Sequence, residues 1–478
     1  MGDWVLKRAE IRNVAKAVAV HEQNNNSCAH ERLDEPTERL AVAAGGDRLA
    51  AHNDATVLPD EMPTTSFRPR KVLVLTKLTR LGFERRTHPH CSEDDLREQL
   101  ESRGSDYVHL LERHTHHNAY LQCITNELQR HGIEYRVVHR FDYTDEAVAE
   151  ADAVFTAGGD GTFLLAASRI FDRNKPIIGI NTDPVGSEGY MCLMNKLPHT
   201  YFPGALNRLL SGDFQWLWRQ RIRITMIGPD AFDDPVELHN QQLLHPEHRW
   251  LDHVREAEES NRLSTSTTAA FARTSSSRRR HTLTQQSTSN GDCGDRCAET
   301  PRVLPFLALN EVFMGESVSS RVSYFETRFD VDKAVTMKQK NSGITVCTGT
   351  GSTSWYFNIN RLTKPCVRQL LRIINDEAQT CVRADDDRLV SRICERFNDQ
   401  LLFDPSDTRM AYTIRDPVNN RTFRCDRPRG FITRAEIKSR CFDAHLVIDG
   451  GMSFAFNNGT RAVLEIRPQD ALRTVVFR

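Results

Sequence analysis

The 478-residue sequence lacks three features that would point to common protein classes. First, it has almost no net charge, because 63 Lys and Arg residues nearly cancel 64 Asp and Glu residues. No global field therefore favours nucleic acid or an anionic membrane, and any phosphate binding must be local. Second, no apolar run approaches the roughly 20 residues that a membrane span needs. The N-terminus also has no secretory apolar region, and we expect neither nucleic acid nor a membrane as a partner.

The third missing feature is a cysteine framework. Twelve cysteines are scattered along the chain. Cys293 and Cys297 lie in a low-complexity stretch, with no second pair at zinc-finger spacing. A disulfide scaffold and a structural zinc site are both disfavoured, and reduced thiols in an intracellular compartment fit better.

A cluster of three histidines, His114, His116 and His117, invites a metal site. On a helix, however, Glu112 and His116 would share one face while His114 lies on the other side. Three or four ligands therefore do not converge, and a metal site needs that convergence. Surface histidines are the favoured interpretation, and the metal ligands of the protein stay unassigned.

The first half of the chain predicts a disordered leader followed by an α/β domain. Residues 1–68 are polar and have no sustained period, which is typical of a leader or targeting arm. From 69 to 215, apolar runs such as 71–77, 135–139, 153–156 and 176–180 alternate with helical patterns near 106–131, 146–150 and 163–171. Strands and helices at this spacing predict βαβ units and a parallel sheet.

The second half predicts a β-rich domain over 216–465. Alternation at 221–227, 321–329 and 446–448 indicates strands. An insertion at about 252–302 has almost no bulky apolar residues and is expected to be disordered. A second insertion, at about 361–405, carries helical periodicity. The last segment, 466–478, is expected to return to the first domain.

The loop from Gly158 to Thr162, Gly-Gly-Asp-Gly-Thr, is the strongest candidate for chemistry. It lies between a predicted strand and a predicted helix, where an α/β sheet presents ligands. Gly158, Gly159 and Gly161 would let the backbone approach a phosphate, and the helix N-terminus would attract that anion. Asp160 would repel a bare phosphate, so its presence suits phosphoryl transfer in which it accepts a hydroxyl proton beside Mg²⁺. A simple tight turn remains the alternative.

Two further motifs favour a nucleotide site. Asn310 and Glu311 follow an apolar run, where polar side chains need partners. Ribose hydroxyls would serve, and an internally bonded pair is the alternative. The second motif, from Thr348 to Trp355, offers small hydroxyl residues for phosphate or adenine edges and an indole for stacking; its candidate members are Thr350, Gly351, Ser352, Thr353, Ser354 and Trp355. The sequence has neither a P-loop nor a Gly-x-Gly-x-x-Gly fingerprint, so P-loop chemistry and hydride transfer are disfavoured.

Together these motifs resemble the NAD kinase family, and specifically its animal mitochondrial branch. The resemblance covers 70–250 and 303–478 and includes the runs 179–184 and 447–451. It implies an α/β N-terminal domain with a parallel sheet plus a β-rich C-terminal domain. It also implies transfer of the γ-phosphate of ATP to the 2′-hydroxyl of the adenosine ribose of NAD with Mg²⁺ or Mn²⁺, in a mitochondrial homodimer.

The resemblance also implies roles for single residues. Asp160 would be the base, Asn310 and Glu311 would hold ribose hydroxyls, and Thr353 with Ser354 would meet the adenine. Asn181 would line the dinucleotide groove and Tyr190 would pack near the substrate. The sequence departs from the family at Ser342, where an Asp is common, and at Trp355, where a Tyr is usual.

Two other functions stay open at this stage. Lipid kinases share the Gly-Gly-Asp-Gly-Thr loop, although a lipid kinase gives no reason for Asn310 and Glu311. A non-catalytic dinucleotide sensor would keep the same motifs without turnover.

Overall fold

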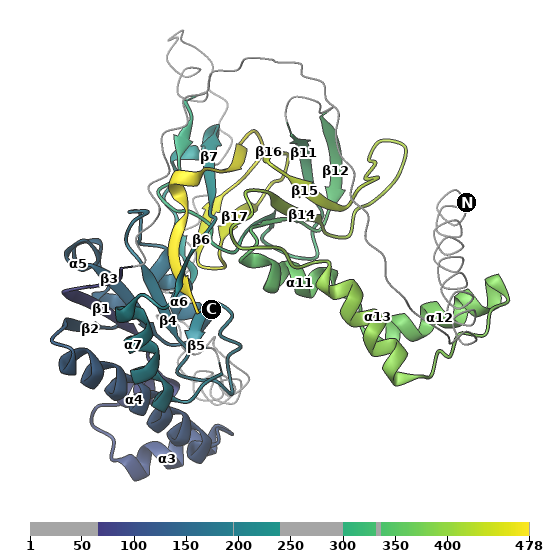
Figure 1. Ribbon diagram of the computed structural model, residues 1–478. Coiled ribbons are helices and arrows are strands. Elements are labelled where there is room, and N and C mark those ends of the chain that lie inside the picture. The colour runs from purple at the N-terminus through teal and green to yellow at the C-terminus, as the bar shows by residue number, and fades with distance from the viewer. Residues whose placement is uncertain (1–65, 195, 240–299, 331–335, 478) are drawn as a thin grey trace, which may run out of the picture. The chain divides into compact units, whose positions relative to one another are not determined.

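The computed structural model describes residues 66–194, 196–239, 300–330 and 336–477 (Figure 1). The described part of Asn360–Leu401 is one compact unit, and that of Thr65–Ile359 with Leu402–Arg478 is another. Nearly all of the predicted leader and most of the predicted insertion at 252–302 lie outside the described residues. Within the described ranges, no helix combines the length and apolarity that crossing a membrane requires.

A five-stranded parallel sheet forms the core of the first domain. Its strand order is β2-β1-β3-β4-β5. The central strands β1 and β3 are buried along almost their whole length, because helices cover both faces of such a sheet and its strands read as continuous apolar runs. The strands are β1 (Lys71–Thr76), β2 (Glu134–Val138), β3 (Ala153–Ala157), β4 (Ile177–Ile180) and β5 (Cys192–Met194).

Helices pack on both faces of this sheet. The helices α4 (Tyr107–Arg130) and α7 (Phe202–Ser211) contribute to one core cluster, and α5 (Asp145–Glu150) and α6 (Asp160–Ala167) contribute to the other. The fold class predicted for this domain is confirmed. Phe67 is 4% exposed and belongs to the first cluster, so the predicted leader ends too late: a single apolar residue in a polar stretch gave no period to detect.

Two helices precede α4 that the sequence analysis missed. They are α2 (Arg80–Thr87) and α3 (Glu93–Ser102). Both are dense in charge, which hides their few core positions. Each has a side-chain N-cap, from Thr79 and from Ser92, and Ser92 forms a complete capping box with Asp95. These caps satisfy backbone N–H groups that a helix start leaves without partners.

The β-rich domain consists mainly of two antiparallel sheets. The seven-stranded sheet has the order β15-β14-β13-β10-β17-β18-β8, and the six-stranded sheet has the order β12-β11-β16-β19-β7-β9. The strands are β7 (Ile222–Ile227), β8 (Val236–Glu237), β9 (Arg302–Val303), β10 (Glu311–Glu316), β11 (Ser323–Phe329), β12 (Met337–Asn341), β13 (Ile344–Cys347), β14 (Met410–Ile414), β15 (Arg429–Ile432), β16 (Arg434–Ser439), β17 (Ala444–Ile448), β18 (Met452–Ala455) and β19 (Arg461–Ile466). Because Arg302 pairs with β7, the predicted insertion also extends slightly too far.

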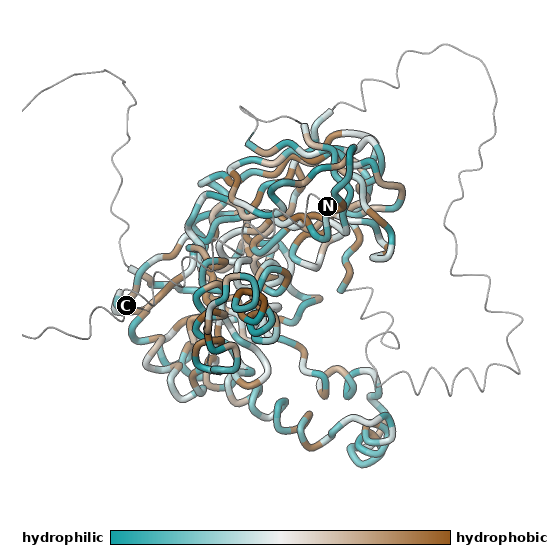
Figure 2. The backbone as a smooth tube through the Cα atoms, turned by 90° about the vertical axis from the view of Figure 1, so that its right-hand side faces the viewer, coloured by the Kyte–Doolittle hydropathy of each residue, from teal (hydrophilic) through white to brown (hydrophobic). Residues whose placement is uncertain are grey.

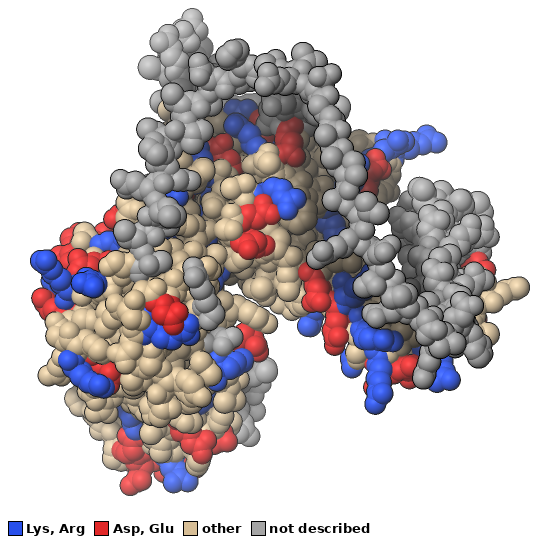
Figure 3. Space-filling view, viewed as in Figure 1, with Lys and Arg blue, Asp and Glu red and all other residues tan. Residues whose placement is uncertain are grey.

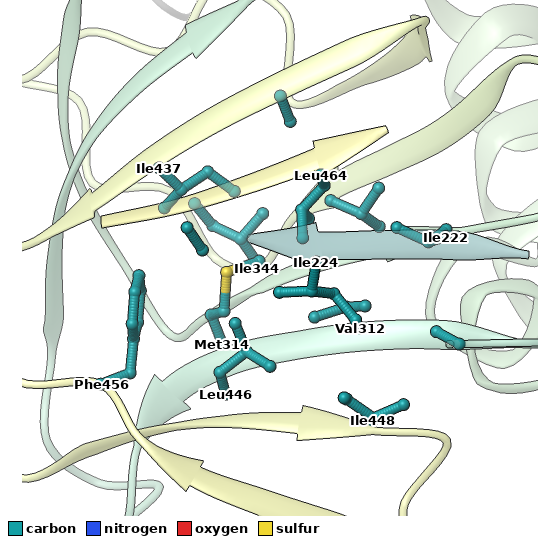
Figure 4. Close-up of a cluster of buried hydrophobic side chains, with 14 of the residues drawn as sticks. Ile222, Ile224, Val312, Met314, Ile344, Ile437, Leu446, Ile448, Phe456 and Leu464 are labelled. Carbon is teal, nitrogen blue, oxygen red and sulfur yellow. The ribbon is translucent and has the colours of Figure 1, made fainter. Parts of the chain in front are cut away.

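One apolar core joins the two antiparallel sheets. Figure 4 shows Ile224 and Leu464 from one sheet pointing toward Val312 and Leu446 from the other. These side chains alternate along their strands with residues that face away, as the two-residue period of a strand requires. This core fixes β10 and β13, whose ends carry two of the predicted motifs.

A two-stranded antiparallel ribbon joins the strand that follows α7 to the C-terminal segment. It pairs β6 (Gln215–Arg219) with β20 (Leu472–Val476). Beside it, the fully buried Arg221 donates from Nε to the carbonyl of Asp470 at 2.6 Å and from Nη1 to the carbonyl of Ile170 at 2.7 Å. A buried guanidinium bound to carbonyl oxygens ties the end of α6 to the C-terminal segment.

The helical unit contains α12 (Lys364–Ala378) and α13 (Asp387–Asp399). Their apolar faces pack together through Val367, Leu371 and Val390, as the predicted helical periodicity of this insertion requires. Helical coils in Figure 2 alternate between teal and brown along their turns, the pattern of amphipathic helices. On the face shown in Figure 3, basic and acidic side chains are interspersed, and neither sign forms a large patch.

Candidate active site

The Gly158–Thr162 loop turns tightly from β3 into α6. A Cβ atom on Gly158 would lie 2.2 Å from Thr162 Oγ1, and one on Gly159 would lie 2.4 Å from Ser187 Oγ. Neither position has room for a side chain. By contrast, Gly161 is exposed and has open space around it. The first two glycines thus permit close packing, and the third leaves the start of α6 open to a ligand.

Asp160 is held by the backbone on the opposite side of the loop. It is half-buried, and its two carboxylate oxygens accept N–H groups from Tyr190 at 3.1 Å and Met191 at 2.9 Å. The Asp160 carboxylate, which would repel a bare phosphate, is therefore held in place by two backbone N–H groups. An ionised carboxylate has about four lone-pair positions, so Asp160 can still accept a proton.

The segment from Asn181 to Tyr190 provides those two donors. Asn181 is fully buried, donates from Nδ2 to the carbonyl of Ser187 at 3.1 Å and accepts the N–H of Asp183 at 3.1 Å. Its amide thus supports the loop from within rather than presenting itself to a groove. Tyr190 is 57% exposed, which leaves its ring available near Asp160.

Asn310 and Glu311 bring unsatisfied polar atoms to the start of β10. Both residues are buried, and Asn310 donates from Nδ2 to Ser354 Oγ at 3.3 Å. Within the described chain, Asn310 Oδ1 and Glu311 Oε2 have no hydrogen-bond partner. Buried acceptors are normally satisfied. An internally bonded pair therefore accounts for only part of this arrangement, and these two atoms could each still accept a hydrogen bond.

Asp449 fixes the backbone at this point and perturbs Glu311. Its carboxylate accepts the N–H groups of Leu309, Asn310 and Glu311 at 2.8, 2.8 and 3.0 Å. Burial first, and the Asp449 charge second, raise the pKa of Glu311 to about 8. Burial raises the pKa of Asp449 to about 6. At neutral pH, Glu311 is mostly a neutral acid that can both donate and accept a hydrogen bond.

Most hydroxyls of the Thr348–Trp355 loop hold the loop itself. Ser352 Oγ donates to the carbonyl of Gly349 at 2.7 Å, and Thr353 Oγ1 donates to that of Thr350 at 3.2 Å. A Cβ on Gly351 would lie 2.1 Å from the carbonyl oxygen of Asn310, which explains a glycine there. The loop therefore packs directly against the Asn310 strand.

The exposed end of that loop is the part that remains for a ligand. Ser354 lies beside Asn310 through the bond already described. Trp355 is 39% exposed and packs against Phe313, with ring centroids 4.8 Å apart. The predicted stacking face is thus present. The phosphate-binding concavity stays a prediction: Ser352 and Thr353 already donate to carbonyls of the loop, whereas the Thr350 hydroxyl accepts from Arg219.

Sequence analysis overlooked a group of cations beside the Gly158–Thr162 loop. A cavity of about 520 Å³ adjoins Gly159, Asp160 and Gly161, and four basic side chains line it: Lys77, Arg80, Arg86 and Arg140. Three of them form ion pairs, with Asp183, Glu84 and Glu237 respectively for Lys77, Arg80 and Arg140. Their positions in the sequence show no spacing pattern. Lys77, Arg80 and Arg86 all follow β1 in the sequence, and the pairing of β1 with β2 brings Arg140 to the same cavity.

A fifth cation, Arg219 at the end of β6, was also missed. It is 8% exposed and donates from Nη1 to Thr350 Oγ1 at 3.3 Å, while its Nε has no partner among the described residues. Burial lowers the pKa of Arg219 to about 10, and the negative charge of Asp160 opposes that shift. The guanidinium therefore remains charged at neutral pH and links the Thr348–Trp355 loop electrostatically to Asp160.

The prediction that the three histidines lie on the surface is wrong for His117. This residue is 3% exposed, and its two ring nitrogens hydrogen-bond Thr76 Oγ1 at 2.9 Å and Thr182 Oγ1 at 2.8 Å. Burial lowers the pKa of His117 to about 3, so the ring is neutral. It joins the ends of β1 and β4, a contact that the three-histidine cluster in the sequence did not reveal.

Comparisons with known proteins show the family to which this chain belongs. A family model described as the ATP-NAD kinase N-terminal domain matches residues 88–214. A protein from Rattus norvegicus named NAD kinase 2, mitochondrial, is 40% identical over 439 residues, which cover 90% of this chain and 94% of the relative. This chain belongs to the NAD kinase family. A relative of the same name from Homo sapiens is 41% identical and covers 86% of this chain and 85% of its own.

The family membership confirms the resemblance drawn from the motifs. The mammalian and Xenopus tropicalis relatives are all named mitochondrial, in agreement with the predicted localisation. A solved NAD kinase from Archaeoglobus fulgidus in complex with ATP is 13% identical, with a TM-score of 0.43, and covers 85% of this chain and 93% of that one. The relatives from Rattus norvegicus and Homo sapiens are named NAD kinases, so they give the lipid-kinase alternative no support.

Proposed function

We propose that this chain transfers the γ-phosphoryl group of ATP to the 2′-hydroxyl of the adenosine ribose of NAD, giving NADP and ADP. The observation that carries this proposal is the pair of buried acceptors, Asn310 Oδ1 and Glu311 Oε2, that have no hydrogen-bond partner within the described chain. A ribose supplies hydroxyl donors, and buried acceptors without donors are costly. Membership of the NAD kinase family supports the same substrate pair.

Asp160 is the proposed base. In this scheme the 2′-hydroxyl gives its proton to the Asp160 carboxylate as the bond from oxygen to the γ-phosphorus forms. The bond from the γ-phosphorus to the bridging oxygen breaks, and ADP leaves. The amides of Tyr190 and Met191 fix the carboxylate for this step, and positioning is the main protein contribution in such transfers.

The acceptor side of the proposed site consists of Asn310, Glu311, Ser354 and Trp355. The first two would bind ribose hydroxyls, and the neutral acid form of Glu311 suits them because it can donate as well as accept. Ser354 and the exposed face of Trp355 would meet the adenine. Tyr190, exposed beside Asp160, would pack on the same substrate.

A divalent metal is part of the proposal and fits the residues present. No group of three or more His, Cys, Asp or Glu among the described residues can hold a metal alone. Mg²⁺ is commonly bound by one or two carboxylates together with substrate phosphates, and Asp160 is the carboxylate at this loop. A Mg²⁺ or Mn²⁺ ion bound there would neutralise charge on the donor phosphates.

The homodimer implied by the family resemblance also belongs to this proposal. Sedimentation velocity of the purified chain tests it. A single species at the mass of two chains is the expected result, and a species at the mass of one chain would contradict it.

The decisive test is NADP formation from NAD and ATP by the purified protein, measured by enzymatic cycling. Asp160→Asn should lower the rate by about 10²- to 10⁴-fold, the range for loss of a general base, with NAD binding retained by calorimetry. Glu395→Gln, an exposed change on α13, is the matched control. Unchanged turnover in Asp160→Asn would remove that residue from the mechanism, and tight NAD binding by the wild type without any turnover would favour a sensor.

A further inference from the structure

A second pocket lies at the edge of the parallel sheet opposite the Gly158–Thr162 loop. Arg70 directly precedes β1, Asp152 directly precedes β3 and Pro176 directly precedes β4, and all three line a pocket of about 400 Å³. Because β1, β3 and β4 are parallel neighbours, their starts lie together at one edge of the sheet, and the loop that follows β3 lies at the other. This pocket is therefore separate from the site that contains Asp160.

The lining of this pocket has an excess of positive charge. Arg68 and Arg70 are exposed, and neither side chain forms a hydrogen bond or an ion pair within the described ranges. Asp152 is the acid among the described lining residues, and its Oδ2 accepts the N–H groups of Arg70 at 2.7 Å and Lys71 at 2.9 Å. These backbone bonds lower the pKa of Asp152, so it is ionised. With Arg473, three arginines against one aspartate leave two positive charges in excess.

The third arginine, Arg473 on β20, is held in place by its neighbours. Its guanidinium carbon lies 3.6 Å from the centroid of the Trp216 ring, and its Nη1 donates to the carbonyl of Asn174 at 3.2 Å. Among the described residues, no hydrogen bond of its Nη2 is found. A planar guanidinium that is already stacked loses little conformational freedom when it binds an anion. Arg473 therefore gives the pocket a preorganised cation beside two exposed ones.

The aromatic rings of the lining do not offer a surface for a base. Phe67 is 4% exposed. Trp216 is covered by Arg473 on one face, and its ring meets that of Phe214 edge-on at a centroid distance of 4.7 Å. Arginine binds phosphate and carboxylate groups through paired N–H donors. A volume of about 400 Å³ is in the range of small-molecule sites, so a ligand with several such groups fits better than a nucleoside.

We propose that this pocket binds a small polyanion with two or more phosphate or carboxylate groups, held by Arg68, Arg70 and Arg473. The proposal does not depend on the proposed function. Both β1 and β3 run from this pocket to the edge that carries Asp160. A polyanion bound here and the substrates of the enzyme would thus occupy opposite edges of one sheet and would not compete for the same groups.

Calorimetry of the full chain with two probes, tripolyphosphate and citrate, tests the proposal in metal-free buffer. Arg68→Gln and Arg70→Gln each remove one exposed guanidinium from the pocket. Arg421→Gln, between β14 and β15, removes an exposed guanidinium elsewhere and is the matched control. Arg86→Gln removes a cation from the cavity at the Gly158–Thr162 loop and controls for binding there. The tighter of the two probes shows whether the site prefers phosphate or carboxylate groups.

Arg68→Gln and Arg70→Gln should each raise the Kd of the tighter probe about 10-fold or more, because hydrogen bonds to charged groups are among the strong ones. Arg421→Gln should match the wild type. In the NADP assay without either probe, Arg68→Gln and Arg70→Gln should keep kcat and both KM values within about 2-fold of the wild type, because neither residue lines the cavity beside Asp160.

Three results would overturn the proposal. The first is that neither probe binds the wild type at millimolar concentration. The second is a Kd that rises in Arg86→Gln and stays unchanged in Arg68→Gln and Arg70→Gln, which would place the probe at the Gly158–Thr162 loop instead. The third is a large loss of kcat in Arg68→Gln or Arg70→Gln, which would contradict a site separate from turnover. Absence of NADP formation by the wild type would refute the proposed function, and the calorimetry would still decide whether this pocket binds a polyanion.

Discussion

Replacing Glu311 by Gln should flatten the pH dependence of stability of this protein above pH 6. Glu311 has an ordinary pKa of 4.5 and a pKa of about 8 in the folded chain. Between these values the unfolded chain has lost the proton and the folded chain keeps it. Because the folded state binds more protons in this window, stability falls as pH rises from 4.5 through 8.

The size of the effect follows from the two pKa values. At pH 6 the ionisation of Glu311 in the unfolded chain already costs the folded state about 2 kcal/mol, and at pH 9 it costs about 5 kcal/mol. The folded wild type should therefore lose about 3 kcal/mol between pH 6 and pH 9 through this residue alone. Glu311→Gln cannot ionise and keeps the shape of the side chain, so it should not show this loss.

Thermal unfolding of the ligand-free protein measures the difference. For a domain of about 150–250 residues, 1 kcal/mol corresponds to roughly 2–4 °C in Tm. The decrease in Tm from pH 6 to pH 9 should thus be about 6–12 °C smaller in Glu311→Gln than in the wild type. Asp449 is present in both proteins, so its own titration largely cancels. Glu395→Gln, on the exposed face of α13, should behave as the wild type.

Parallel Tm curves for wild type and Glu311→Gln would refute this reasoning. They would mean that Glu311 ionises in the folded chain near its ordinary pKa, which burial without a partner for Oε2 does not permit. A larger pH dependence in the variant would contradict the sign of the argument. Either result would also remove the neutral acid from the proposed ribose contact.

Two further perturbations test the scaffold around Asp160. Gly159→Ala should lower kcat/KM for NADP formation by about 10-fold or more, because its Cβ would push Ser187 and shift the segment that anchors Asp160; Ser187→Gly in the same protein should recover part of the loss, and no recovery would contradict the clash. His117→Gln should lessen the loss of stability on acidification, because the unfolded chain takes up a proton below pH 6.5 and folded His117 does so only near pH 3. Between pH 7 and pH 5 the wild type should lose about 2 kcal/mol more than the variant, measured as Tm at the two pH values, and equal losses would exclude this role.

The features that sequence patterns predicted are those with a local cause. The apolar runs of β1 and β3 had to be buried strands, and the glycines of the Gly158–Thr162 loop had to make a close turn. The amphipathic periods of α12 and α13 likewise predicted these two helices. In each case the residues that determine the structure are neighbours in the chain.

The features that escaped prediction depend on which distant segments meet. Arg86 and Arg140 are ordinary surface cations until the order β2-β1-β3 brings them to one cavity. His117 is one of three nearby histidines, and only the contact of α4 with the ends of β1 and β4 buries it. Phe67 lacked apolar neighbours that would have marked it as core. Local composition does not determine strand order, so the contacts of these residues could not be predicted from the sequence.

The anchored state of Asp160 explains how one carboxylate can serve both the fold and the proposed chemistry. Each of its oxygens accepts one backbone N–H, from Tyr190 or Met191, and these bonds leave lone pairs for a proton. The same bonds prevent the side chain from rotating away when an anionic donor arrives. Arg219, charged and nearly buried, adds a positive charge near the same loop. A free carboxylate at this position would be repelled by phosphate, whereas a tethered one stays in place to accept the proton of the ribose hydroxyl in the proposed transfer.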